Sequence, residues 1–296
     1  MKTGVCGRIQ QILAALLPLS TTRVIINTQD YETNMVAVSR SPVLITFTTW
    51  KALFLREAVN RLSAGRAAWL WLLLEPVLHI VFMLFVFTVI RMKSVGGIDV
   101  IIWLTVGFLS FFMFKNTGVQ TMNAIGANQA LFTYRQVKPV DAVLVRGGLE
   151  GFLTILVAII MFAGVGLFGK SITPNNPLAT LEAALGLWLF GLGFGLSTSV
   201  LKEMIPELGK IIALLMTPLY LFSGVIFPLS TIPQPYRGWL MLNPVPHGLE
   251  AARLSFSPYY QIIPETSISY LYAWALISIF IGLALQMRFA NQLIMK

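Results

Sequence analysis

The side chains best suited to chemistry are ionisable groups that lie inside long apolar stretches. Glu75 and His79 are one helical turn apart, Arg146 and Glu150 have the same spacing, and Glu182 stands alone. A charge at membrane depth is costly, so each of these groups is a candidate functional residue. Glu75 and His79 suit either a proton relay or a carboxylate that orients a helix. Arg146 and Glu150 predict an ion pair within one helix, and five separated groups do not make a hydrolytic site.

A second set of candidates is aromatic. Six rings gather around the proline-rich stretch that follows position 219, where amphipathic rings beside a wet cavity would give sugar faces a smooth stacking surface. We expect these rings to line a path for a sugar polymer. They are Tyr220, Phe222, Tyr236, Trp239, Tyr259 and Tyr260.

Glycine patterns have a nucleotide-binding interpretation and a packing interpretation. The sequence GVGLFGKS at 164–171 matches the phosphate-loop pattern, but such a loop follows a strand, and here an apolar helix is expected to precede it. We therefore reject nucleotide binding and expect Lys170 to end a helix at the lipid headgroups. Small residues four apart let helices approach closely, within one subunit or between two. Two pairs have this spacing, Gly147 with Gly151 and Gly191 with Gly195.

Composition indicates which elements must position these groups. Hydrophobic residues make up 56% of the 296 and charged residues 11%, well below the roughly 25% charge of a soluble domain. A helix crosses the hydrocarbon core with about 20 apolar residues. Six stretches approach that length: 67–90, 98–114, 144–168, 178–201, 211–229 and 268–287. The sequence therefore predicts an all-α integral membrane protein, with six transmembrane helices in a domain at 67–296 and no portion large enough for an enzyme domain.

The basic residues are unequally divided between the two sides of this predicted bundle. Of the 21 lysines and arginines, 16 fall on one side, and the positive-inside rule places that side, with both termini, in the cytoplasm. The net charge of +9 then reflects topology, and a nucleic-acid partner is not expected. Cys6 is the only cysteine, so neither a disulfide framework nor a metal site is predicted.

The region before the first predicted span has two parts. Residues 1–42 form a poorly defined N-terminal extension, within which Met35 is an alternative start. Residues 43–66 place apolar and basic side chains at helical spacing, which predicts an amphipathic helix on the cytoplasmic surface, with Glu57 paired to Arg61. A simple surface anchor and a docking surface for a partner both remain open.

Two connections between spans differ from plain loops. In 115–140, apolar residues at helical spacing predict a short helix with no apparent core of its own. Such a helix often inserts into the groove of a partner, and a helix that lies on the bilayer would show the same pattern. The segment 219–253 begins as a membrane span, breaks at Ser223 and Gly224, and then meets four prolines between 233 and 246. Backbone that leaves helical pairing at membrane depth is tolerated only where it is buried in protein or lines a wet cavity. A re-entrant segment at about 230–253, beside a polar path, is therefore predicted on the outer side.

Three blocks resemble the permease family of type-2 ATP-binding-cassette exporters, in particular the KpsM-like capsular polysaccharide export family. They are LFLREAVNRLSAGRAAWLWLLLEPVLHI at 53–80, ANQALFTYRQVKPVDAVLVRGGLE at 127–150 and LFSGVIFPLSTIPQPYRGWLMLNPVPHGLEAAR at 221–253. The third block is the most specific, because the order SG-x-x-F-P, then I-P, then N-P-x-x-H recurs in that family. The resemblance covers about residues 43–296.

This resemblance implies a transport subunit of the bacterial inner membrane that is not an enzyme and has no cofactor of its own. The implied partners are a second copy of the chain, two copies of a cassette ATPase carrying ATP and Mg, and a lipid-linked polysaccharide, while a periplasmic adaptor is left open. The resemblance makes 46–66 an interface helix and the loop after 128 a coupling helix. The residues expected to couple the ATPase are Glu57, Arg61, Gln129, Phe132, Tyr134 and Arg135.

Other functions remain open from the sequence. The same fold could export O-antigen, teichoic acid or a hydrophobic drug. A proton-coupled secondary transporter would use Glu75 and His79, although such folds usually show internal repeats, and none is evident here. A membrane glycosyltransferase or polymerase would need clustered carboxylates, whereas the inner loops offer only Glu203 and Glu207.

Overall fold

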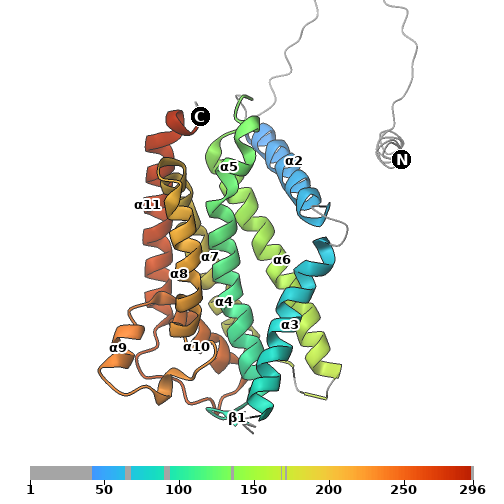
Figure 1. The fold of residues 1–296 in the computed structure, drawn as a ribbon, viewed down its shortest axis with the longest axis vertical. Helices are drawn as coiled ribbons and strands as arrows, with labels where there is room; N and C mark the ends of the chain where they lie inside the picture. Colours follow the sequence, from blue (N-terminus) through green and yellow to red (C-terminus); the bar gives the residue numbers. More distant parts are fainter. Residues whose placement is uncertain are drawn as a thin grey trace, which may run out of the picture. The chain divides into compact units, whose positions relative to one another are not determined.

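The computed structural model describes residues 42–63, 68–89, 94–134, 137–167, 169–170 and 172–294, most of them helical (Figure 1). The longer helices are α2 (Pro42–Ser63), α3 (Ala68–Val89), α4 (Val100–Met122), α6 (Pro139–Leu167), α7 (Pro177–Met204), α8 (Glu207–Phe222), α10 (Pro244–Phe256) and α11 (Ile268–Ile294). The short elements are β1 (Ser94–Val95), β2 (Ile98–Asp99), α5 (Ala124–Asn128), η1 (Gln129–Leu131), η2 (Leu229–Thr231) and α9 (Tyr236–Leu240). The expected N-terminal extension lies outside the described residues, apart from Pro42.

The helical membrane fold predicted from composition is confirmed. Four of the described helices, α4, α6, α7 and α11, are long and apolar enough to cross a membrane. Helix α3 contains a shorter apolar stretch, Leu74–Phe87, and α8 is a 16-residue helix with Pro218 inside it. A helix therefore occupies each of the six predicted stretches, and four of the six have the length and hydropathy that a span requires.

A small hairpin joins α3 to α4, which the all-helical prediction does not include. Strand β1 pairs antiparallel with β2, and the turn uses Gly96 and Gly97, whose φ angles of 56° and 90° suit glycine. The Asp99 carboxylate accepts a hydrogen bond from the amide two residues on, at 2.9 Å, as N-cap side chains do. Helix α4 therefore begins at Val100, two residues later than predicted.

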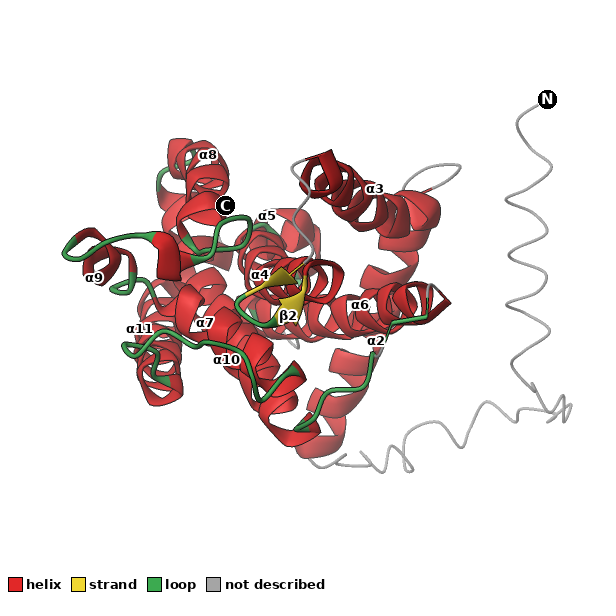
Figure 2. Ribbon diagram, turned by 90° about the horizontal axis from the view of Figure 1, so that it is seen from below, coloured by secondary structure: helices red, strands yellow, loops and turns green. Residues whose placement is uncertain are grey.

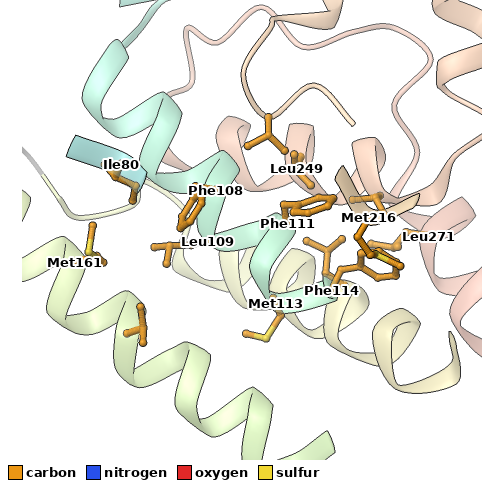
Figure 3. Close-up of a cluster of buried hydrophobic side chains, with 14 residues drawn as sticks. Ile80, Phe108, Leu109, Phe111, Met113, Phe114, Met161, Met216, Leu249 and Leu271 are labelled. Carbon is orange, nitrogen blue, oxygen red and sulfur yellow. The ribbon is translucent and has the colours of Figure 1, made fainter. Parts of the chain in front are cut away.

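The largest cluster of buried side chains surrounds α4. Phe108, Phe111 and Phe114 of α4 are almost fully buried, among side chains from α3, α6, α7, α8, α10 and α11 (Figure 3). Helix α7 approaches α4 closely because glycine stands at the contact. A Cβ added at Gly191 would lie 2.7 Å from the carbonyl oxygen of Phe114.

The other glycines of the two small-residue pairs also face helices of the same chain. A Cβ at Gly151 in α6 would lie 2.6 Å from Trp188 Nε1 in α7, and one at Gly195 in α7 would lie 2.7 Å from Thr121 Cβ in α4. Trp188 Nε1 also donates to the Gly147 carbonyl oxygen at 2.8 Å. The sequence allows these glycines to serve contacts within one subunit or between two. In the structure they serve contacts between helices of one subunit.

The chain breaks after α8, where the sequence predicts a break. Gly224 has a φ of 74°, and a Cβ there would lie 2.6 Å from Leu229 Cγ, so the position requires glycine. After η2 and α9, helix α10 packs against α4, α7 and α11, with ten of its 13 residues buried. In Figure 1, α9, α10 and β1 lie at one end of the helices, which we call the α10 end, and α5 lies at the other, the α5 end.

Candidate functional site

The strongest candidate site is the buried face of α10. The Asn243 side chain caps this helix by accepting from an amide of its first turn at 3.1 Å, and it donates to Ser223 Oγ at 3.0 Å. His247 is held at both ring nitrogens, because Nδ1 accepts from the Ser267 amide at 2.9 Å and Nε2 lies 2.8 Å from the Met241 carbonyl oxygen. A neutral ring that carries its proton on Nε2 satisfies both contacts.

Arg253 is the central charge of this face, and its side chain is fully buried. Its Nη1 donates to the Gly224 carbonyl oxygen at 2.9 Å and to Glu250 Oε1 at 3.0 Å, and its Nη2 donates to the Val225 carbonyl oxygen at 3.1 Å. The guanidinium also lies over Trp103, 3.7 Å from the ring centroid, in a cation–π contact. The break after α8, helix α10 and helix α4 therefore meet at one side chain.

Tyr260 completes this network by donating to Glu250 Oε2 at 2.8 Å. Burial raises the pKa of Tyr260 to about 12, so the hydroxyl keeps its proton and this bond at physiological pH. Glu250 thus has a partner at each carboxylate oxygen, as a buried charge requires. The partners of Arg253 and Glu250 in this network are all groups of the protein itself. The network therefore holds α10 against α4 and the end of α8.

Two of the exposed aromatic candidates lie on α9. Tyr236 and Trp239 pack edge to face with ring centroids 5.8 Å apart, and both are exposed. Between them in sequence, Arg237 pairs with Glu265 at 2.9 Å. The hydrogen bond from Arg237 lowers the pKa of the Glu265 carboxyl. The remaining exposed rings of the predicted path are Phe222 and Tyr259.

The other two aromatic candidates do not join this surface. Tyr220 Oη on α8 lies 2.6 Å from His79 Nε2 on α3. The aromatic candidate Tyr220 therefore pairs with one of the ionisable candidates. Tyr260 is only 7% exposed, because its ring is covered inside the α10 network. The expectation that Tyr260 offers a stacking surface to a sugar is therefore corrected. Glu75, one turn before His79, is exposed and forms no ion pair with another described residue.

At the α5 end, four charges link α2 to α6. Arg61 pairs with Glu150, and Arg146 pairs with Glu57 at 3.2 Å; both carboxylates are buried. The expected pairs within each helix, Glu57 with Arg61 and Arg146 with Glu150, are replaced by crossed pairs. The reason is that α2 packs against α6, which brings each carboxylate to an arginine of the opposite helix.

The predicted coupling segment is packed more deeply than expected. Phe132 is buried with side chains of α5, α6, α7 and α11, so the expectation that this segment lacks a core is wrong. Gln129 is exposed, and its side chain donates to Glu203 Oε2 at 3.4 Å. Tyr134 is 65% exposed, and Arg135 lies outside the described residues.

A groove of about 510 Å³ lies between α2 and the segment that follows η1. Arg56 on its wall donates to Asn128 Oδ1 at 3.0 Å, which ties α2 to α5. Tyr134 lines the opposite wall. The groove and this exposed ring form a part of the α5 end that is open to a partner.

The sequence that forms these two ends matches one known family. The sequence profile of the ABC-2 type transporter family matches residues 48–256, which is more than half of the chain. The chain belongs to the ABC-2 type transporter family. The crossed ion pairs at the α5 end and the buried face of α10 both lie inside the matched region.

Three relatives of this ABC-2 type chain cover most of its length. The polysialic acid transport protein KpsM of Escherichia coli is 35% identical over 84% of this chain and 96% of its own. The capsule polysaccharide export inner-membrane protein CtrC of Neisseria meningitidis serogroup A is 29% identical over 69% of this chain and 77% of its own. The capsule polysaccharide export inner-membrane protein BexB of Haemophilus influenzae is 25% identical over 81% and 90%.

Sequence reasoning misses the residues that organise the α10 end of this ABC-2 type chain. It selects neither Glu250 nor Arg253 as a functional residue. The signal is nevertheless present, because Asn243, His247, Glu250 and Arg253 follow one another at spacings of three or four. Such spacing places polar groups on one face of a helix.

The phosphate-loop pattern of this ABC-2 type chain begins at the end of a helix, whereas a phosphate loop follows a strand. Its first four residues, 164–167, are the last residues of α6, so an apolar helix leads into the pattern, as expected. Lys170 forms an ion pair with Asp99 at 2.6 Å, so it links the α6–α7 connection to the N-cap of α4. Ser171 lies outside the described residues.

Proposed function

We propose that this chain is the permease subunit of an ATP-driven exporter that moves a lipid-linked capsular polysaccharide across the bacterial inner membrane. The observation that carries the proposal is 35% identity with the polysialic acid transport protein KpsM over 84% of this chain. The capsule export names of the CtrC and BexB relatives support the same substrate class. The four long apolar helices support a function inside the membrane.

In this proposal the energy comes from another chain. A second copy of the subunit completes the passage, and two copies of a cassette ATPase, which hold ATP and Mg, act on the α5 end. The groove beside Tyr134 and the crossed ion pairs between α2 and α6 support this assignment. A displacement of α2 or of the segment after η1 would pass to α6, and through the cluster around Phe132 to α7 and α11. ATP hydrolysis would thereby switch the dimer between two packed arrangements.

The proposed topology has six spans, formed by α3, α4, α6, α7, α8 and α11. The α5 end and both termini face the cytoplasm, because 16 of the 21 basic residues fall on that side. The segment from α9 to α10 is then re-entrant at the outer side. Arg253 supports this placement, because it supplies donors to the carbonyls left free after α8, as backbone at membrane depth requires. Exposed Tyr236 and Trp239 would flank the outer mouth, where a periplasmic adaptor could also dock.

Gene deletion in the organism that carries this chain tests the proposal. We expect deletion to remove capsular polysaccharide from the cell surface and to leave the polymer inside the cell. A plasmid copy should restore export only when the partner ATPase retains its catalytic residues. A normal capsule in the deletion strain would contradict the proposal. Loss of O-antigen or of drug resistance with an intact capsule would favour the corresponding alternative substrate, and export without ATP would favour the proton-coupled alternative.

A further inference from the structure

A stripe of aromatic and charged side chains lies on one face of α4. Phe108, Phe112 and Lys115 are four and three residues apart, so they share a face of the helix. The Phe108 and Phe112 rings have centroids 4.0 Å apart, and Lys115 Nζ lies 4.9 Å from the centroid of Phe112. The stripe therefore continues without interruption toward the α5 end.

Two side chains of α3 extend this stripe. The His79 ring stacks on Phe108 with centroids 4.5 Å apart, and both Glu75 and Lys115 are near enough to His79 to act on it electrostatically. Glu75 is seven residues from the start of α3, and Lys115 is seven residues from the end of α4. The two helices run in opposite directions. Glu75 is one turn from His79 and Lys115 is two turns from Phe108, so both charges lie on the α5 side of the stacked His79 and Phe108 rings.

Helix α8 bounds the stripe on its other side. Helices α3 and α8 both pack on α4, and Figure 2 shows them as separate helices on the same side of it. The pair formed by His79 and Tyr220, 2.6 Å apart, bridges them. On the side of this pair toward the α10 end, the space lined by Ile80, Met83, Leu104 and Val225 has no room for a water molecule. The described side chains therefore close the stripe at this bridge.

The charges of the stripe require polar surroundings. Glu75 is exposed and has no ion pair with another described residue, and Lys115 is partly exposed. A carboxylate and an ammonium group at membrane depth face water or protein, not lipid tails. Stacked aromatic rings with a charged donor over one of them and a charged acceptor one turn from the stack also match a sugar, whose apolar face stacks on rings and whose hydroxyls form charge-assisted hydrogen bonds.

We infer that Glu75, Phe112 and Lys115 form a binding subsite for the hydroxyl-rich chain of the transported polymer, in a water-filled inner part of the passage. The inference rests on the proposed function and names its contact with the substrate. The bridge between His79 and Tyr220 marks the outer limit of this subsite. Glu75 thus holds sugar and His79 closes the subsite, in place of the proton relay considered from the sequence.

Labelling of a single cysteine tests the inference in the complete transporter. Phe112→Cys is made in a Cys6→Ser background, which has no other cysteine. Inverted membrane vesicles without ATP are prepared from cells that make the polymer and from cells that lack its synthesis. We expect a charged, membrane-impermeant maleimide to label Phe112→Cys in polymer-free vesicles, and the labelling rate to fall severalfold when polymer is present. Phe280→Cys on α11, 76% exposed on an apolar helix, is the matched control and should stay unlabelled in both.

Failure of labelling in polymer-free vesicles would overturn the inference, because the stripe would then be covered by lipid or protein. Labelling that the polymer leaves unchanged would also overturn it. As a second measurement, Glu75→Gln and Lys115→Gln should lower export severalfold at an unchanged membrane level, whereas Glu182→Gln, exposed near the start of α7, should not. If the wild-type chain does not export polysaccharide, the proposed function fails; if it does and these variants behave like it, only the subsite is refuted.

Discussion

Arg61 in α2 donates from Nε to Glu150 Oε1 in α6 at 3.1 Å, across 89 residues of sequence. The reciprocal pair, Arg146 of α6 with Glu57 of α2, joins the same two helices. Each arginine therefore neutralises a carboxylate of the opposite helix. The arrangement ties an amphipathic helix to a helix that is apolar enough to span the membrane, which gives any force on α2 a direct route into the bundle.

Glu150→Gln should loosen α2 from α6. Removing one partner of a buried ion pair costs about 3–5 kcal/mol, and since 27% of the Arg61 side chain is exposed and can reach water, we expect about 1–3 kcal/mol. The exchange of Arg61→Glu with Glu150→Arg should recover most of this loss. Thermal unfolding of the purified chain in detergent measures both effects, with Lys51→Gln on the exposed face of α2 as the control. An unchanged midpoint for Glu150→Gln would show that the pair does not hold the two helices.

Arg253→Lys should release α10 although the charge is kept. A lysine ammonium cannot bridge two carbonyl oxygens and Glu250 while it stacks on Trp103, and partial loss of a buried charge network costs on the order of 3 kcal/mol. We expect a lower unfolding midpoint and less surface polysaccharide. Arg237→Lys is the matched control, because its ion pair is partly exposed and should change stability by less than about 1 kcal/mol. Equal behaviour of the two variants would argue against the role of Arg253.

Phe132 and Tyr134 should respond differently to alanine. Phe132 is buried in the core, so Phe132→Ala should cost about 3–5 kcal/mol of stability. Tyr134 is exposed beside the groove, so Tyr134→Ala should leave the unfolding midpoint unchanged and lower the ATPase activity of the assembled complex. Thermal unfolding and ATP hydrolysis measured on the same preparations separate the two effects. If Tyr134→Ala leaves hydrolysis and export at wild-type levels, this ring does not contact the ATPase.

Gly195→Ala should separate α4 from α7. The new Cβ would lie 2.7 Å from Thr121 Cβ and 3.0 Å from the Gly118 carbonyl oxygen, and crowding of this kind typically costs about 1–3 kcal/mol. Gly164→Ala in α6 is the control, because nothing lies within 4 Å of its added Cβ, and alanine favours a helix by about 1 kcal/mol over glycine. The folded fraction in membranes should therefore fall for Gly195→Ala and hold or rise for Gly164→Ala. A fall for both would indicate that glycine is needed for flexibility and not for close contact.

The ion pair between Arg237 and Glu265 should weaken in acid. The hydrogen bond from Arg237 holds the pKa of Glu265 below its ordinary value of 4.5, so the folded chain binds the proton less readily than the unfolded chain. The stability contributed by this carboxylate is then fully present above pH 4.5 and is lost as pH falls through the lowered pKa. The difference in unfolding midpoint between wild type and Glu265→Gln should be constant from pH 7 to 5 and shrink in more acidic buffer. A difference that persists in strong acid would rule out this ion pair as its source.

Local physical chemistry explains what could be predicted from sequence. Hydropathy and length act on each stretch alone, so the helices around 100–122, 139–167, 177–204 and 268–294 are found close to where they are expected. The break at Gly224 is also local, because the glycine conformation and the prolines that follow act on their own backbone. The regular spacing of polar residues from Asn243 to Arg253 is also a local feature, since it can be recognised without knowing which other helices pack against this segment.

Which side chains meet is decided by the tertiary structure alone. In the sequence, Glu57 has Arg61 one turn away and Glu150 has Arg146 one turn away. In the structure, each carboxylate instead pairs with the arginine of the other helix. Tyr260 is an aromatic residue beside exposed ones in sequence, but folding places its hydroxyl on Glu250. Trp103 and Arg253 are far apart in the chain and in contact in space. Within one helix, a charged side chain reaches only the few residues three or four positions away. Packing brings in charged partners from other helices and removes water from both members of the pair. The contact between helices is then the stronger one, and it forms in place of the local pair.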